Sequence, residues 1–491
     1  MTLTVALDAG TTGVRAIAFN EAVEVQFEAY RELTQYFPAP GEVEHDAVEI
    51  AQLAVEVLGE LARWARSEGQ AIEAIGITNQ RETIVCFDRA TGRVAGHALV
   101  WQDRRGEGFC EELRHAGHER RVREVTGLVL DAYFSASKMR WLLDHGTADH
   151  LTRPALATID TWLMWWLTGG VEGGVFATEA SNASRTLLFD LDALAWSKEM
   201  GDLFGVDPAY LAEVRPSAGS FGEVSARVLP ELGGLPITGV LGDQQAALFG
   251  QACFAPGVVK ATYGTGAFVL ANTGARPPFA LEGLLTTIAW DLGDVGPVAY
   301  ALEGSAFVAG AAVQWLRDEL GFIQHSSELE ALALSVSDSG GVNFVPAFTG
   351  LGSPFWNPEA RGAITGLTRG SGRAHIARAL VEALAYQVRA ITDAYRDGGV
   401  ALRELRADGG AAAMNHVLQL QASGSRLSVL RSASLEATAR GAATLAGLAT
   451  GLYPSLDALE ELWHCERRFE PEDPLFVDAG YAAWRRACLV A

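Results

Sequence analysis

Cysteine is scarce in this sequence of 491 residues. Only five cysteines occur, they lie far apart, and none forms a CxxC pair. This distribution argues against a disulfide framework and against a zinc site, and it is typical of proteins from a reducing compartment. We therefore expect a cytoplasmic protein.

Positive charge and long apolar runs are also in short supply. Lys and Arg number 38 against 60 Asp and Glu, so the formal net charge is −22. An acidic chain is poorly suited to general binding of nucleic acid or anionic membranes, and we expect neither as a partner. Asp8 and Arg15 interrupt the apolar N-terminal stretch, which argues against a signal peptide. The aromatic run at 162–167 is too short to cross a bilayer, so we expect no membrane insertion.

Several well-known catalytic motifs are absent from the sequence. It has no GxxxxGK[ST] P-loop, no HRD or DFG kinase signature, no GxSxG elbow and no HExxH. Any phosphoryl transfer must therefore use a different phosphate-binding architecture.

The composition that remains is that of a globular protein with a large core. Apolar residues make up 49% of the chain, and the 53 glycines indicate many tight turns. A strand, a Gly/Thr turn and a second strand open the chain at 2–20, and the same pattern returns at 257–274. Helices and strands alternate after each of these units. We predict one α/β domain used twice, with an N-terminal domain over 1–247 and a C-terminal domain over 248–491.

Periodicity within the two halves predicts individual elements. Residues 300–321 are interpreted as a turn followed by a helix. The remaining predictions are helices over 47–69, 136–167, 374–398 and 412–424, and strands over 72–80 and 404–410.

The two Gly/Thr turns are candidate phosphate-binding loops. In the first, small residues let backbone N–H groups point at an anion, Thr11 and Thr12 add hydroxyl donors, and Arg15 adds positive charge. Thr265 lies in the matching turn of the second half. Either turn alone equally fits a plain β-hairpin, but two in matching positions favour a phosphate chain clamped between two domains. Asp8, at the end of a strand, is a candidate for holding Mg²⁺ through water.

Three polar or glycine-rich segments follow predicted strands. Arg81 and Glu82 form a donor–acceptor pair suited to hydroxyl groups, or else part of a solvated loop. Asp243 ends an apolar strand and opens a helix, so it is either a helix cap or a general base. Gly409 and Gly410 allow a flat ligand such as adenine to lie on the backbone, or form an ordinary loop.

Several long stretches together resemble the FGGY carbohydrate kinases, most closely the members that phosphorylate glycerol. The likeness covers nearly the whole chain. It implies the actin-like, ribonuclease-H-like ATPase fold, with two domains around a central cleft. The most specific stretches include GITNQRETIVCFDRATG (76–92), VWQDRR (100–105), SNASRTLLFD (181–190), GDQQAALFGQ (242–251), TYGTGAF (262–268) and LEGSAFVAGAAVQWLRDE (302–319).

The resemblance also implies roles for individual residues. Asp243 matches the catalytic base, and Asp8 matches the acidic residue near Mg²⁺. The polyol-binding positions are Arg81, Glu82, Trp101, Tyr133, Asp243, Gln244 and Phe268. The ATP-binding positions are Thr11, Thr12, Gly13, Arg15, Thr265, Gly310, Gln314 and Gly410. The resemblance further implies glycerol and ATP as substrates, Mg²⁺ as the metal, and a homo-oligomer, either a dimer or a tetramer.

Five positions depart from the family pattern. The first turn reads GTTGVR where GTTSSR is usual, which removes two hydroxyls from the phosphate loop. Met414 stands where an Asn near adenine is usual, Glu179 replaces an Asp, and Glu42 replaces a Trp. None of these changes falls on the polyol-binding positions.

Two alternative functions are compatible with parts of this pattern. One is an FGGY kinase for another small polyol or ketose. The other is an actin-like ATPase without a sugar substrate, which would share the two phosphate turns. Such a protein has no need for the Arg81–Glu82 pair, Tyr133 and Asp243 together.

Overall fold

The first half of the chain is built on a five-stranded sheet in the order β14-β6-β1-β2-β3. The computed structural model describes residues 2–278, 281–472 and 474–491. β1 and β2 form the expected antiparallel hairpin, with Asp8 opposite Arg15, while β6 and β14 run parallel to β1. The strands are β1 (Thr2–Ala9), β2 (Gly13–Phe19), β3 (Val25–Glu32), β6 (Ala71–Asn79) and β14 (Ile237–Gly242).

The second half repeats this sheet with two additional strands. Its order is β17-β18-β16-β15-β21-β22-β23, and the central five strands reproduce both the order and the strand directions of the first sheet. This repetition confirms the predicted doubling. The strands are β15 (Val258–Tyr263), β16 (Ala267–Gly274), β17 (Leu285–Asp291), β18 (Val298–Ala306), β21 (Glu404–Asp408), β22 (Ser428–Ser432) and β23 (Cys465–Phe469).

Shorter strands form further sheets in both halves. The first half carries a second five-stranded sheet in the order β4-β5-β8-β7-β9. These strands are β4 (Gln35–Tyr36), β5 (Glu44–His45), β7 (Ile84–Asp88), β8 (Ala98–Leu99) and β9 (Pro154–Thr158). The paired strands are β10 (Ala177–Glu179) with β13 (Glu213–Arg215), β11 (Phe189–Asp190) with β12 (Ala195–Trp196), and β19 (Asn343–Val345) with β20 (Ala363–Thr365).

Helices cover the sheets, and α1 shows how the sequence sets their limits. Asp46 caps its first turn by accepting from the N–H groups of Val48 and Glu49, and the helix stops just before Gly69, whose φ is +65°. Within the described ranges, no helix is both long and apolar enough to cross a membrane. The first-half helices are α1 (Ala47–Ser67), α2 (Glu107–His115), α3 (Glu119–Thr126), α4 (Ser135–Asp144), α5 (Ile159–Leu167), α6 (Ala180–Ala183), α7 (Lys198–Phe204) and α8 (Asp243–Gly250). The second-half helices are α9 (Gly310–Asp318), α10 (Leu329–Leu334), α11 (Arg373–Asp397), α12 (Asn415–Ser425), α13 (Ala437–Thr450), α14 (Leu456–Glu461) and α15 (Pro474–Cys488).

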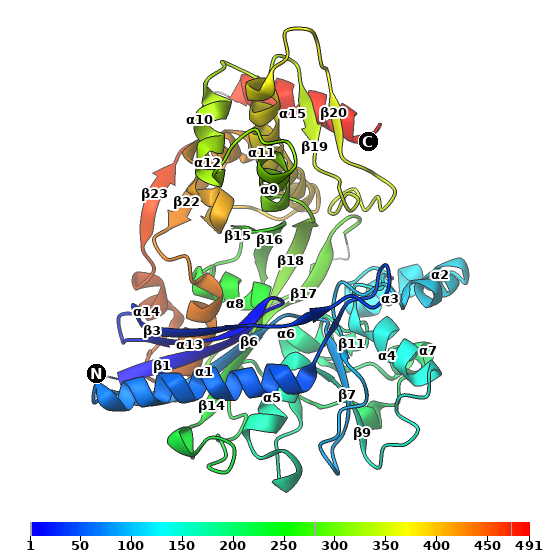
Figure 1. Cartoon of the computed structure of the whole chain (residues 1–491), viewed down its shortest axis with the longest axis vertical. Helices are drawn as coiled ribbons and strands as arrows, with labels where there is room; N and C mark the ends of the chain where they lie inside the picture. Colours follow the sequence, from blue (N-terminus) through cyan, green and yellow to red (C-terminus); the bar gives the residue numbers. More distant parts are fainter. Residues whose placement is uncertain (1, 279–280, 473) are drawn as a thin grey trace.

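The two halves share a packed interface at α8 and α13. Although α13 comes late in the chain, it lies against the first sheet, in contact with β1, β6 and β14 (Figure 1). A Cβ at Gly441 of α13 would lie 1.8 Å from the carbonyl oxygen of Ala246, and one at Gly250 would lie 1.9 Å from that of Ala437. Only glycine permits this approach of the two helices. The predicted domain boundary near residue 247 lies within α8.

Two of the predicted elements are wrong. The stretch 136–167 is not one helical region, because β9 separates α4 from α5. Pro154 opens that strand, which pairs antiparallel with β7. Residues 300–306 belong to β18 rather than to a turn. Both strands are buried on both faces, so the alternation that identifies a strand in a sequence is missing. The other predicted helices and strands are confirmed to within a few residues.

Candidate active site

Three parallel strands bring the predicted functional segments to one edge of the first sheet. In register, Ala9 at the end of β1 pairs with Asn79 at the end of β6, and Asn79 pairs with Gly242 at the end of β14. The first phosphate turn, the Arg81–Glu82 pair and Asp243 directly follow these strand ends. Ligands of open α/β sheets bind at this carboxyl edge.

The Arg81–Glu82 pair is buried, which excludes a solvated loop. Gln80, Arg81 and Glu82 are at most 3% exposed. Glu82 also adopts a left-handed backbone conformation, with φ of +59°. Non-glycine residues held in that region cost free energy and cluster at functional sites.

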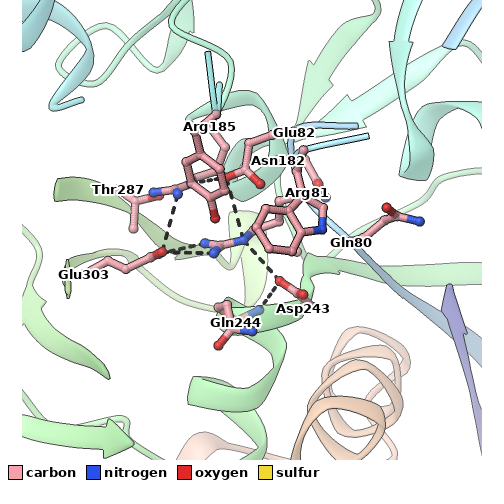
Figure 2. A network of polar contacts seen from close by, with 12 residues as sticks. Gln80, Arg81, Glu82, Asn182, Arg185, Asp243, Gln244, Thr287 and Glu303 are labelled. Atoms are coloured by element: carbon pink, nitrogen blue, oxygen red, sulfur yellow. Dashed lines mark hydrogen bonds and ion pairs between the residues drawn. The ribbon is translucent and has the colours of Figure 1, made fainter. Parts of the chain in front are cut away.

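Arg81 lies between two carboxylates (Figure 2). Its Nη1 and Nη2 donate to the two carboxylate oxygens of Glu303, at 2.7 and 2.9 Å, and Nη1 also donates to Gln245 Oε1 at 3.1 Å. On the other side, Nε lies 3.1 Å from Asp243 Oδ1. The guanidinium therefore joins the predicted base to a carboxylate from the second half.

Glu82 is held by a second buried arginine. Arg185 Nε donates to Glu82 Oε1 at 2.5 Å, and the Arg185 guanidinium lies over the rings of Tyr133 and Phe134. Burial raises the pKa of Glu82 despite Arg185 and Arg81, and burial also raises that of the Tyr133 phenol. The Tyr133 hydroxyl therefore remains a neutral hydrogen-bonding group at physiological pH.

Trp101 connects the predicted polyol positions to the first phosphate turn. Its ring packs edge-on against Tyr133, with 5.6 Å between ring centroids. Its indole Nε1–H donates to Thr11 Oγ1 at 3.0 Å. Phe268, the other predicted aromatic wall, lies in β16 of the second half, opposite Thr262 and Ser305 on the neighbouring strands.

Asp243 opens α8, where it is accessible to a substrate. Gly242, rather than Asp243, occupies the N-cap position of α8, so Asp243 is not the cap residue of this helix. The Asp243 side chain is 30% exposed and accepts from the backbone N–H of Gln244 at 2.7 Å. Gln244 in turn accepts from the buried Lys260 Nζ at 2.6 Å, and burial lowers the pKa of Lys260 to about 8.

The first phosphate turn is exposed at Thr12 and partly exposed at Thr11. Arg15 does not point into free space: Nε donates to Asp8 Oδ2 at 2.9 Å, and Nη1 lies 2.5 Å from Glu436 of the second half. Burial raises the pKa of Asp8, with Arg15 acting against it.

The second phosphate turn is fastened to the start of α9. The backbone N–H groups of Ala309 and Ala311 donate to the carbonyl oxygen of Thr265, and that of Gly310 donates to Gly264. A Cβ at Gly310 would lie 2.6 Å from the Gly264 carbonyl oxygen. Thr265 itself is exposed, as is Gln314 one turn along α9.

The predicted adenine loop follows β21, beside the second phosphate turn. Gly409 has φ of +87°, and a Cβ there would lie 2.5 Å from the carbonyl oxygen of Tyr263. Gly410 is exposed, and a Cβ there would meet no atom within 4 Å. Asn415, next to the departure at Met414, begins α12 and accepts from Arg431.

Four buried residues of this site were missed by sequence reasoning: Arg185, Gln245, Lys260 and Glu303. Two of them carried a signal, because Lys260 and Glu303 are single charges within otherwise apolar strand sequences. Arg185 and Gln245 lie inside the quoted family stretches without any local pattern that marks them.

The carboxylate of Asp8 would suit a magnesium ion that also binds a phosphate ligand. Mg²⁺ usually keeps several waters and binds one or two carboxylates together with substrate phosphates. Asp8 supplies one buried carboxylate beside the first phosphate turn. Among the described residues, no three His, Cys, Asp or Glu side chains form a ready-made metal cluster.

Family models and relatives match both halves of the chain. The N-terminal domain model of the FGGY family of carbohydrate kinases matches residues 3–250, and the C-terminal domain model matches residues 259–450. Glycerol kinase from Bordetella parapertussis is 50% identical over 98% of this chain and 96% of the relative. Glycerol kinase from Halorhodospira halophila is also 50% identical, over 98% and 95%.

Solved structures show the same fold. The structure of Plasmodium falciparum glycerol kinase with ADP has a TM-score of 0.93 at 34% identity and covers 99% of this chain and 97% of that one. Xylulose kinase from Rhodospirillum rubrum has a TM-score of 0.88 at 23% identity over 99% and 98%, a likeness of fold alone. With two matching domain models, the doubled sheet and full-length relatives, this chain belongs to the FGGY family of carbohydrate kinases.

Proposed function

We propose that this protein transfers the γ-phosphoryl group of ATP to glycerol and releases sn-glycerol 3-phosphate and ADP. The observation that carries the proposal is the buried pair Arg81 and Glu82 next to the accessible carboxylate of Asp243, beside a phosphate turn. The names of the relatives that match over the full chain support glycerol as the substrate.

Asp243 is the proposed general base. Its carboxylate takes the proton of a primary hydroxyl while that oxygen attacks the γ-phosphorus, and the bond to the ADP oxygen breaks. Phosphoryl transfer depends mainly on alignment and charge neutralisation. One accessible carboxylate beside Arg81 is therefore enough to act as the base, and the reaction needs no covalent intermediate on the protein.

The remaining polyol positions supply donors, acceptors and apolar walls for a three-carbon chain. Arg81 and Gln244 donate, Glu82 accepts, and the rings of Trp101 and Tyr133 contact carbon. Phe268 is proposed as the wall from the second half.

We propose that ATP lies between the two phosphate turns. The first turn contributes Thr11, Thr12, Gly13 and Arg15, and the second contributes Thr265. Gly310, Gln314 and Gly410 face the nucleoside part. A bound Mg²⁺ near Asp8 would neutralise charge on the phosphates. We assign these roles to the domains 1–247 and 248–491.

A coupled kinase assay over glycerol, dihydroxyacetone, erythritol, xylulose and ribulose tests the proposal. We expect kcat/KM for glycerol to exceed the others at least tenfold, because an unpaired buried polar group costs ~1–3 kcal/mol. A higher value for erythritol or xylulose would contradict glycerol as the substrate. ATP turnover without any polyol would favour an actin-like ATPase.

We further propose a cytoplasmic homo-oligomer, either a dimer or a tetramer. All five cysteines are free, and four of them are buried, which suits a reducing compartment. Light scattering coupled to size exclusion measures the assembly, and a monomeric mass would contradict it.

A further inference from the structure

Glu303 is a charged residue of the second half that reaches into the polyol site of the first. It lies in β18, is fully buried, and contacts Arg81 across 222 positions of sequence. Figure 2 shows its carboxylate facing the Arg81 guanidinium from the side opposite Asp243.

Charge balance explains why this carboxylate tolerates burial. Arg81, Arg185, Glu82 and Glu303 are each at most 3% exposed and together carry two positive and two negative charges. Burial alone would raise the pKa of Glu303, but Arg185 and Arg81 outweigh it and hold that pKa at about 2. Removing one member would leave an unpaired buried charge.

A count of donors shows what Glu303 does to Arg81. A guanidinium has five N–H groups in a rigid plane. Both donors on Nη1 are used, by Glu303 and Gln245, and one donor on Nη2 is used by Glu303. The second Nη2 donor and Nε–H remain, and Nε lies beside Asp243. Because the two-bond fork fixes the plane, it also fixes the direction of these remaining donors.

We propose that Glu303 is a positioning residue for polyol binding: it holds Arg81 in the orientation that serves the substrate and Asp243. The polyol site of the first half is then complete only with β18 of the second half in place. This inference rests on the proposed role of Arg81 as a polyol ligand.

Two substitutions of Glu303 separate its geometry from its charge. Glu303→Asp keeps the charge but shortens the side chain by one methylene, so the fork to Arg81 is lost. We expect the glycerol KM to rise about tenfold while the ATP KM stays within twofold. Glu303→Gln keeps the shape but unbalances the charges, and we expect kcat/KM for glycerol to fall about a hundredfold.

Ser184→Ala is the matched control. Ser184 Oγ bonds Thr287 Oγ1 and accepts from the N–H of Ile288, so it also joins the two halves, but it lies outside the Arg81 fork. We expect its glycerol KM to stay within twofold of the wild type. Circular dichroism and thermal melting establish that each variant is folded.

Several outcomes would overturn the proposal. One is a glycerol KM within twofold of the wild type for folded Glu303→Asp and Glu303→Gln. Another is an equal loss in the glycerol and ATP KM, or a loss matched by Ser184→Ala, since either indicates general damage to the interface. Failure of both Glu303 variants to fold would assign Glu303 a purely structural role.

The same measurements distinguish this proposal from the proposed function. Wild-type turnover of glycerol tests the function, whereas the ratio of variant to wild-type KM tests the positioning. If the wild type prefers another polyol of the panel, glycerol is the wrong substrate. The Glu303 ratio is then measured with the preferred polyol, and an unchanged KM there overturns the positioning role.

Discussion

The two phosphate turns occupy equivalent places in equivalent sheets but are held in different ways. The first has side-chain supports in addition to backbone bonds such as Leu33 N–H to Thr12: Gln80 Nε2 donates to the carbonyl oxygen of Gly10, and Trp101 donates to Thr11. Backbone groups hold the second, through the N–H groups at the start of α9 that donate to Gly264 and Thr265. A side-chain support tolerates change at the turn itself, whereas a backbone support requires glycine where the chains meet.

The groups that surround the two turns also differ, charged around the first and backbone around the second. The first turn lies among charges, with Asp8, Arg15 and Glu436 in contact. The second lies against carbonyl oxygens: a Cβ at Gly266 would lie 2.6 Å from that of Ala306. In the proposed function, the first half would therefore supply the reacting groups, and the second half would supply a rigid surface for the nucleotide together with the carboxylate of Glu303.

The largest expected effect comes from removing the group that has no equivalent in the second half. Asp243→Asn keeps the shape but cannot accept a proton, and general-base catalysis typically contributes ~10²–10⁴ in rate. We expect kcat to fall by that factor while the glycerol dissociation constant changes little, measured by steady-state kinetics and calorimetry. A variant that keeps more than about half of the wild-type kcat at neutral pH would show that Asp243 is not the base.

A smaller effect tests the two kinds of support directly. In Gly310→Ala the new Cβ meets the backbone of Gly264, so the second turn must shift. We expect a stability loss of ~1–3 kcal/mol in urea unfolding and an ATP KM raised about tenfold. In Gly13→Ala the atoms nearest to the new Cβ belong to the side chain of Tyr30, which is 48% exposed and can move at the cost of its one hydroxyl bond to Thr12.

We therefore expect Gly13→Ala to lose less than ~1 kcal/mol. Equal losses in the free energy of unfolding for Gly310→Ala and Gly13→Ala would contradict the view that the two turns are supported differently.

The last expected effect appears only when the pH falls below neutral, and it concerns one histidine in each half. His45 is fully buried beside Gln80, its Nε2 has no hydrogen-bond partner, and burial lowers its pKa to about 4. The folded state keeps His45 neutral, so its contribution is present above pH ~6.5 and is lost as pH falls toward 4. Between pH 7 and pH 5, we expect the wild type to lose about 2 kcal/mol more than His45→Gln does in urea unfolding.

His416 provides the matched histidine of the second half. Burial lowers the pKa of His416 to about 4 as well, but His416 is partly exposed. We expect His416→Gln to flatten the pH dependence in the same direction and by less. A His45→Gln variant with the wild-type pH dependence would show that His45 is protonated in the folded state.

Much of the fold was predictable because its signals are local. The two hairpins combine apolar strands with a Gly/Thr turn, and α1 and α11 carry regular helical periodicity, so each was confirmed. The two errors fell on β9 and on residues 300–306 of β18. Strands buried on both faces lack alternation, and their apolar runs resemble those of helices.

The site was predictable only as separate segments. Sequence alone determined the doubled α/β design, the glycines of the turns and the segments that carry Arg81, Glu82 and Asp243. Tertiary structure alone decided that Arg81 lies between Asp243 and Glu303, that Arg185 holds Glu82, and that Arg15 joins Asp8 to Glu436. The physical reason is that a buried charge needs a partner of opposite sign, and that partner can come from any strand that folding brings near.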